Sequence, residues 1–214
     1  MTPPRLYVVL DTTASAGRDL DEILAAAIAG GAEMIQLREK TEPSGTIFPI
    51  AQRLRARCRA AGVPFIVNDR VDLAMAVEAD GVHLGQEDLP PAAARALMKP
   101  GMILGLSTHS ETQAEAAQAA GADYVAVGSM FPTTTKPIKH LVGPVLARRV
   151  RPFVQVPLIG IGGITPENVG EVIKAGCDGV AVISAVCAAP DPRAAARRFA
   201  AAIAAARAGR ARVD

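Results

Sequence analysis

The stretch Ala175-Gly176-Cys177-Asp178-Gly179-Val180-Ala181-Val182 decides the fold, because its pattern recurs along the chain. A helical segment ends in glycine, a short step follows, and a run of apolar, mostly β-branched residues begins. A glycine just past a helix end takes the left-handed conformation that caps the helix. A short apolar run is typical of a parallel strand that helices cover. The pattern therefore predicts a repeated unit in which a helix leads into a buried parallel strand.

The same pattern appears in the stretches 30–37, 61–68, 80–85 and 120–127. Taken together, the apolar runs predict eight strands, at 5–11, 33–40, 64–69, 81–85, 102–107, 124–129, 157–162 and 179–184. Helical patterns lie at 19–30, 46–61, 70–79, 90–98, 110–120, 143–151, 165–176 and 191–208. Eight alternating β-α units predict an α/β fold, a closed (β/α)8 TIM barrel. We expect residues 1–214 to form this single compact domain, with its active site at the C-terminal ends of the strands.

The alternative architecture is an open, doubly wound sheet. It is disfavoured because no G-x-G-x-x-G follows the first predicted strand. Three of the predicted helices have clear start signals, at Ser110-Glu111, Thr165-Pro166 and Asp191-Pro192.

The composition of the chain disfavours several classes of protein. The net charge is only +2, aromatic residues make up 3% and there is no Trp, which disfavours a nucleic-acid partner. No apolar run reaches the roughly 18 residues of a membrane helix, and the first residues, 1–5, lack the apolar core of a signal peptide. Cys58, Cys177 and Cys187 have no metal-site spacing. We expect a cytoplasmic protein that acts on small molecules and has no membrane partner.

The second predicted strand ends in the stretch 36–40, QLREK. Strand side chains alternate between faces, so Gln36, Arg38 and Lys40 share one face. If the intervening apolar residues pack under the helices, that face is the barrel interior, where two cations and an amide would need an anion. The alternative is that Arg38 and Lys40 are solvated at the rim and pair with Glu39.

Two carboxylates follow the third and fourth predicted strands. Asp69 and Asp88 therefore belong to neighbouring loops. A pair of carboxylates with no thiol or imidazole partner suits a hard cation such as Mg²⁺, shared with substrate phosphate oxygens. The alternative is that each Asp caps the helix that follows it.

Two further loops have the composition of phosphate sites. The loop 129–136 is rich in hydroxyl groups, ends in Lys136, and is longer than most βα loops. Gly162-Gly163 follows the seventh strand, and barrels often hold phosphate in the loops after the last two strands. The alternatives are a polar surface loop and an ordinary structural turn.

Motifs of hydrolytic chemistry are missing: the chain has no G-x-S-x-G, no H-E-x-x-H and no P-loop lysine. His83, His109 and His140 lack metal-ligand spacing, and each is compatible with an ordinary polar role. The residues thus indicate a site for two anionic groups and a metal, with little proton-transfer machinery.

The ordered set of motifs resembles the thiamine-phosphate synthase (thiamine-phosphate pyrophosphorylase) family over about residues 5–200. The motifs are QLREK (36–40), ND (68–69), HLGQED (83–88), GLSTHS (105–110), FPTTTK (131–136), IGGI (161–164) and VIS (182–184). The resemblance implies a transferase of a pyrimidinylmethyl group in thiamine biosynthesis. Its substrates would be 4-amino-2-methyl-5-hydroxymethylpyrimidine diphosphate and 4-methyl-5-(2-hydroxyethyl)thiazole phosphate, and its products thiamine phosphate and diphosphate. It also implies a Mg²⁺-assisted, dissociative loss of diphosphate.

The resemblance implies roles for individual residues. Catalytic roles fall on Arg38, Lys40, Ser107 and Lys136, and Mg²⁺ binding falls on Asp69 and Asp88. Substrate binding falls on Gln36, Leu37, Arg38, Glu39, Lys40, Asn68, Ser107, Thr133, Thr134, Thr135, Lys136, Gly163, Ile183 and Ser184. The resemblance assigns no role to the loop 137–142 or to His140.

Three other functions compete with this interpretation. One is a tautomerase-like paralogue that isomerises a thiazole phosphate, for which His109 is the candidate residue. Another is a phosphate-binding barrel that isomerises or epimerises a sugar phosphate. The third is a non-catalytic protein that binds thiamine phosphate. The complete set of cations and carboxylates favours the synthase. The sequence leaves the oligomeric state open, with a homodimer as one option.

Overall fold

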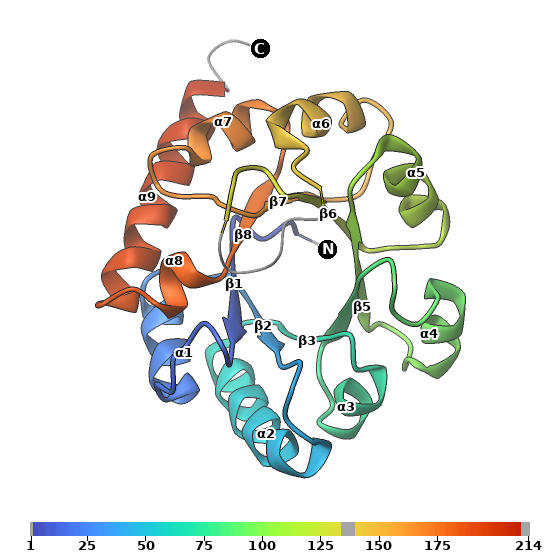
Figure 1. Cartoon of the computed structure of the whole chain (residues 1–214), viewed down its shortest axis with the longest axis vertical. Helices are drawn as coiled ribbons and strands as arrows, with labels where there is room; N and C mark the ends of the chain where they lie inside the picture. The colour runs from blue at the N-terminus through green and yellow to red at the C-terminus, as the bar shows by residue number, and fades with distance from the viewer. Residues whose placement is uncertain (1, 134–139, 211–214) are drawn as a thin grey trace.

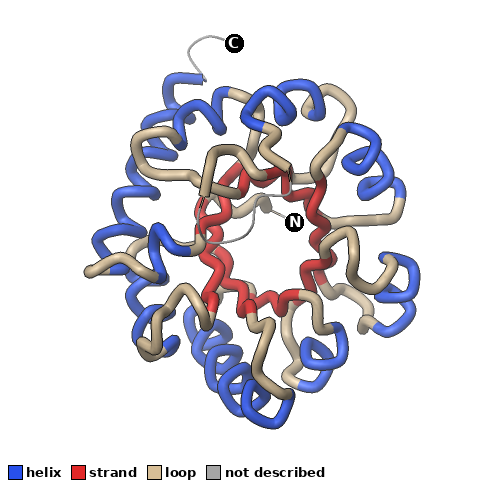
Figure 2. The backbone as a smooth tube through the Cα atoms, in the orientation of Figure 1, coloured by secondary structure: helices blue, strands red, loops and turns tan. Residues whose placement is uncertain are grey.

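The computed structural model describes residues 2–133 and 140–210, in which eight parallel strands close into a barrel ringed by helices (Figure 1). The strands are hydrogen-bonded in chain order, and β1 closes the ring by pairing with β8. Figure 2 shows the strands as an inner ring and the helices as an outer one. The predicted (β/α)8 barrel is therefore confirmed.

The elements follow the predicted ranges closely. The strands are β1 Leu6–Asp11, β2 Met34–Arg38, β3 Phe65–Asn68, β4 Gly81–Leu84, β5 Ile103–Thr108, β6 Tyr124–Gly128, β7 Leu158–Ile161 and β8 Gly179–Val182. The helices are α1 Leu20–Ala29, α2 Ser44–Ala61, α3 Val71–Ala76, α4 Pro91–Leu97, α5 Glu111–Ala119, α6 Gly143–Val150, α7 Val169–Lys174, α8 Ser184–Cys187 and α9 Pro192–Arg210.

Two of the three predicted helix starts are confirmed by their capping bonds. The Ser110 side chain accepts a hydrogen bond from the Gln113 N–H at 3.2 Å and opens α5. The Asp191 carboxylate accepts from the Ala194 N–H at 2.9 Å and opens α9. Each cap satisfies a backbone donor that the first helical turn leaves unpaired.

The third predicted start, at Thr165-Pro166, is wrong, because α7 begins at Val169. The Asn168 side chain accepts from the Thr165 N–H at 2.8 Å and donates to the Gly163 carbonyl at 3.1 Å. These bonds hold the intervening residues in a turn. Helix α8 was not predicted, because it is only four residues long and has no apolar periodicity to detect.

Side chains alternate between two apolar regions. Ile35 and Leu37 point outward into the large core between strands and helices. Met34 points inward, into a small cluster at the centre of the barrel that includes Tyr7 and Tyr124. This alternation confirms the parity predicted for β2: its polar residues line the barrel interior.

None of the helices in the described part of the chain combines the length and apolar character that a membrane span requires.

Candidate active site

The carboxyl ends of β1 and β2 bring two oppositely charged side chains, Asp11 and Arg38, together inside the barrel. The strand register places Asp11 opposite Arg38, and their side chains form an ion pair. The Asp11 side chain is 3% exposed and that of Arg38 is 17% exposed. The other Asp11 oxygen accepts from the Ala14 N–H at 2.8 Å. Asp11 therefore holds the Arg38 guanidinium in one position. Asp11 is not among the predicted site residues, although a strand that ends in Asp beside a cationic strand was an available signal.

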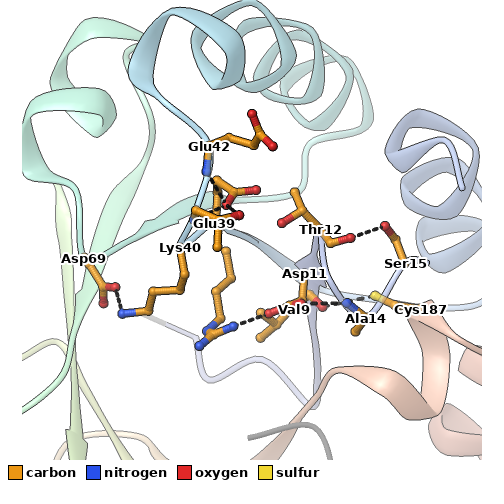
Figure 3. Close-up of polar contacts among 12 residues, drawn as sticks. Val9, Asp11, Thr12, Ala14, Ser15, Glu39, Lys40, Glu42, Asp69 and Cys187 are labelled. Atoms are coloured by element: carbon orange, nitrogen blue, oxygen red, sulfur yellow. Dashed lines mark hydrogen bonds and ion pairs between the residues drawn. The ribbon is translucent and has the colours of Figure 1, made fainter. Parts of the chain in front are cut away.

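Lys40 and Asp69 form a second ion pair, between the ends of β2 and β3 (Figure 3). Asp69 has a φ of +62°, a left-handed conformation that Asp tolerates better than most residues. Its N–H donates to the His83 carbonyl at 2.8 Å, which fixes the turn. The carboxylate thereby faces Lys40 and does not cap α3, whose first flanking residue is Arg70. The helix-cap alternative for Asp69 is wrong.

Asp88 lies against Asp69, and the two carboxyl groups are close enough to share a hydrogen bond. The Gly85 N–H donates to Asp88 at 2.7 Å, which orients the side chain. Burial and the Asp88 carboxyl raise the pKa of Asp69, against the opposing effect of Lys40. Burial also acts to raise the pKa of Asp88, but the hydrogen bonds from Asp69 and Gly85, together with the charges of Lys40 and His83, lower that pKa. Asp88 does not cap α4 either, because Pro90 flanks that helix.

This carboxyl pair has the donor chemistry of a Mg²⁺ site. Two partly buried carboxyl groups that repel each other as anions would be relieved by a divalent cation. Within residues 2–133 and 140–210, no group of three or more His, Cys, Asp or Glu side chains is placed to hold a metal by itself. Mg²⁺ usually binds through one or two carboxylates and completes its shell with water and substrate phosphates. Asp69 and Asp88 fit that pattern.

Glu39 has a different position from its neighbours in the QLREK stretch. Its carboxylate accepts from the Thr41 hydroxyl at 2.8 Å, from the Glu42 N–H at 2.8 Å, and from the Thr41 N–H. Figure 3 shows Glu39 beside the backbone of Glu42, while Lys40 reaches toward Asp69. Partial burial raises the pKa of Glu39, but these bonds and the Thr12 hydroxyl lower it to about 2. Glu39 shapes the loop through these bonds, and its assignment to substrate binding stays a prediction.

A chain of buried polar side chains crosses the barrel below the mouth. The Gln36 amide nitrogen donates to the Tyr7 hydroxyl at 2.5 Å, and the two tyrosine hydroxyls of Tyr7 and Tyr124 are 3.0 Å apart. His83 Nδ1 is 2.8 Å from the Tyr124 hydroxyl, and its Nε2 is 2.8 Å from Ser107 Oγ. Gln36 and Ser107 were predicted site residues. The link between them through His83 and the tyrosines was not predicted.

The loops after β6 and β7 pack directly on each other. Gly162 and Gly163 have φ values of +99° and +62°. A Cβ on Gly163 would lie 2.4 Å from the Pro132 carbonyl oxygen, and one on Gly162 would lie 2.8 Å from Ser129 Cβ. Both glycines are therefore required where the β6 loop crosses the β7 loop. Thr133 ends the described part of that loop, and Thr134, Thr135 and Lys136 lie outside the described residues.

The remaining predicted residues also lie at the carboxyl ends of the strands. Asn68 is the last residue of β3 and is 7% exposed. Ile183 follows β8 and Ser184 begins α8, so the chain turns into a helix at once. Leu37 faces the outer core and not the barrel interior, which leaves its backbone as the only part that can reach a ligand in the interior.

His109 and His140 stack at this end of the barrel, with ring centroids 5.2 Å apart. His109 Nδ1 is 2.7 Å from the Gly128 carbonyl, so this nitrogen carries a hydrogen. The His140 carbonyl accepts from the Ser129 N–H at 3.1 Å, which anchors the end of the β6 loop. The pair thus links the loops after β5 and β6.

A cavity of about 760 Å³ lies at the opposite end of the barrel, near the starts of β3, β4 and β5. Four of its charged side chains form ion pairs: Arg55 pairs with Asp80, and Lys99 pairs with Glu78. Chemistry in this fold belongs to the carboxyl ends of the strands. We therefore place the site at the mouth that holds Arg38 and Lys40.

Comparisons with known proteins show what the chain is similar to. A family model described as thiamine monophosphate synthase matches residues 6–186. The chain is 49% identical to a thiamine-phosphate synthase of Moorella thermoacetica, over 91% of this chain and 93% of the relative. It is 47% identical to one of Haloquadratum walsbyi, over 92% of this chain and 90% of the relative. The solved structure of a thiamine phosphate pyrophosphorylase from Pyrococcus furiosus superposes with a TM-score of 0.87 at 39% identity, covering 94% of this chain and 96% of that one.

Proposed function

Because this chain belongs to the thiamine monophosphate synthase family, we propose that it joins hydroxymethylpyrimidine diphosphate to hydroxyethylthiazole phosphate and releases diphosphate. The chain is a transferase, as its relatives are. The observation that carries the proposal is the pair of cations at the end of β2, Arg38 and Lys40. Asp11, at the end of β1, holds the first, and Asp69, just after β3, holds the second, at the mouth of the barrel.

The reaction needs charge stabilisation more than proton transfer. The C–O bond to the diphosphate breaks, and its electron pair leaves with the diphosphate. The aminopyrimidine ring stabilises the methylene cation that remains, and the lone pair of the thiazole nitrogen forms the new C–N bond. No proton has to move in these steps. This balance is consistent with a site in which the described residues supply cations and hydrogen-bond donors.

Arg38 and Lys40 have the geometry to stabilise the departing diphosphate. Arg38 points into the barrel and is held by Asp11. Its guanidinium therefore needs little reorganisation when negative charge develops on the departing diphosphate. Lys40 is 47% exposed at the rim and can move from Asp69 to a substrate oxygen. Lys136 is proposed to add a third positive charge. Holding both substrates side by side would supply most of the remaining rate.

We also propose that Asp69 and Asp88 bind Mg²⁺. The bound ion would neutralise oxygens of the diphosphate leaving group. Lys40 pairs with Asp69, one member of this carboxyl pair. The loops after β6, β7 and β8 are proposed to hold the thiazole phosphate through backbone N–H groups and Thr133. A cytoplasmic location and a homodimeric state remain part of the proposal.

The test is product formation from the two phosphorylated halves. We expect thiamine phosphate and diphosphate in equal amounts when both halves are present with Mg²⁺, and neither product when one half or the metal is omitted. A folded protein that binds the thiazole phosphate and forms no product would contradict the proposal. Isomerisation of the thiazole phosphate by itself, lost in His109→Asn, would instead identify the tautomerase-like alternative.

A further inference from the structure

We propose that His83, backed by Tyr124 and Tyr7, is a positioning residue that makes the Ser107 hydroxyl a hydrogen-bond donor to the pyrimidine substrate. The identity of the substrate rests on the proposed function. The direction of the hydrogen bonds does not, because it follows from the protein alone.

The chain Gln36–Tyr7–Tyr124–His83–Ser107 links five strands through the centre of the barrel. Its successive contacts are 2.5, 3.0, 2.8 and 2.8 Å long. Gln36, Tyr7, Tyr124 and His83 are 4%, 1%, 0% and 6% exposed, so bulk water does not compete for these groups. A buried donor without an acceptor costs about 1–3 kcal/mol, so each hydrogen in the chain must point to the next group. The bonds therefore all run in one direction.

Two directions satisfy this condition, and Gln36 distinguishes them. In one, hydrogens point from Gln36 toward Ser107; in the other, they point from Ser107 toward the Gln36 carbonyl oxygen. The structure directs Gln36 Nε2 at Tyr7, so the Tyr7 oxygen accepts. The Tyr7 O–H must then donate to Tyr124, its other partner in the chain. The first direction follows.

This direction sets the state of the imidazole. The Tyr124 O–H donates to His83 Nδ1, so Nδ1 carries no hydrogen. The hydrogen lies on Nε2 and is donated to Ser107 Oγ. Ser107 is half-buried near the end of β5. With its oxygen engaged by His83, its own O–H is left to point to an acceptor on the substrate, either a ring nitrogen or a diphosphate oxygen.

Close packing keeps Tyr124 in place. Its ring stacks on His83, with centroids 5.5 Å apart and planes at 21°, and meets Tyr7 edge-on at 5.9 Å. The ring also lies over Gly105, where a Cβ would come within 2.0 Å of Tyr124 Cζ. Gly105 therefore provides the space that the ring occupies, and the hydroxyl has little freedom to turn toward another partner.

The first test observes the imidazole without any substrate. The measurement is an NMR spectrum of the imidazole nitrogens in the whole chain, labelled with ¹⁵N-histidine. The chain has three histidines, and the signals that disappear in His83→Gln belong to His83. We expect the Nε2–H tautomer for His83 at neutral pH. An Nδ1–H tautomer would overturn the proposal, because Ser107 would then donate to His83. In Tyr124→Phe we expect the preference for Nε2–H to weaken, because Nδ1 loses its donor.

The second test asks whether Tyr124 acts through Ser107. Tyr124→Phe should lower kcat/KM for the pyrimidine diphosphate about 5- to 10-fold, the loss of about one hydrogen bond. In a Ser107→Ala background the same change should have almost no further effect, because the donor is already gone. Equal losses in both backgrounds would show a structural role only and would contradict the proposal. His83→Gln, whose amide can still donate to Ser107, should retain more activity than His83→Asn. If Tyr124→Phe does not fold, these two variants are compared with and without Ser107→Ala in its place.

Thr108→Val is the matched control. Thr108 is the next residue on β5, is fully buried, and donates to the Ala126 carbonyl at 3.1 Å on the other face of the strand. Its removal deletes one buried hydroxyl outside the chain. We expect Thr108→Val to leave the His83 tautomer unchanged and to have the same effect with and without Ser107→Ala. Wild-type protein that yields no product would contradict the proposed function, while the tautomer measurement would still decide the direction of the chain.

Discussion

Asp11 and Arg38 lie opposite each other in the register of β1 and β2, and their side chains form an ion pair that is almost closed to solvent. Both Asp11 oxygens are used, one by Arg38 and one by the Ala14 N–H. The carboxylate therefore connects the loop after β1 to the cation that the proposed reaction needs. This relationship leads to the first prediction.

Asp11→Asn should weaken the placement of Arg38, because an amide N–H₂ would replace the oxygen that accepts from the guanidinium. We expect a loss of about 1–3 kcal/mol in the free energy of unfolding. We also expect KM for the pyrimidine diphosphate to rise at least about fivefold. Urea unfolding and steady-state kinetics measure the two effects.

Glu33→Gln is the control, since it removes the exposed Arg5–Glu33 ion pair at the other end of β2 and should lower the free energy of unfolding by less than about 1 kcal/mol. An Asp11→Asn protein with wild-type KM would show that Arg38 does not need its partner.

Asp69→Asn and Asp88→Asn should each raise the Mg²⁺ concentration needed for half-maximal rate by at least about tenfold, because one anionic ligand is lost. Asn is chosen for Asp69 because it also tolerates the left-handed backbone conformation at φ +62°. The measurement is a Mg²⁺ titration of the rate. Asp72→Asn, at a nearby carboxylate that is 66% exposed and paired with Arg70, should leave the titration unchanged. An unchanged titration in both site variants would disprove the metal assignment.

Glu39→Gln should destabilise the protein in a pH-dependent way. The folded-state pKa of Glu39 is lowered to about 2, from an ordinary value near 4.5, so the folded state favours the carboxylate. Its contribution to stability is full above about pH 4.5 and is lost as pH falls toward 2. The stability difference between wild type and Glu39→Gln should therefore shrink over this range, as urea unfolding at several pH values would show. A difference for Glu39→Gln that stays constant with pH would contradict the loop-shaping role.

Gly163→Ala should destabilise the protein by about 2 kcal/mol or more, because the residue combines a φ of +62° with a Pro132 carbonyl oxygen 2.4 Å from the added Cβ. KM for the thiazole phosphate should rise as the β6 and β7 loops separate. Gly170→Ala in α7 is the opposite case: nothing lies within 4 Å of the added Cβ. It should stabilise the helix by up to about 1 kcal/mol. Thermal unfolding compares the two, and equal Tm values would rule out the packing explanation.

Much of the fold follows from local patterns. Glycine-ended helices marked five of the strands, and the apolar runs predicted all eight, because helix caps and strand alternation depend on residues close in sequence. Where competing side chains interfere, local signals mislead. Thr165-Pro166 has the residue types of a helix start, yet the Asn168 side chain holds a turn there. Asp69 resembles a helix cap, yet its backbone directs the carboxylate to Lys40.

The sequence by itself determined the barrel and the inward direction of Gln36 and Arg38, and it predicted the end of the barrel at which we place the site. All three follow from the period of two along a strand and from strand order. Only the tertiary structure paired Asp11 with Arg38 and joined Tyr7 to Tyr124, which are 117 residues apart. These contacts depend on strand register and on closure of the ring. Both are set by the packing of the whole barrel, so no local pattern of residues specifies them.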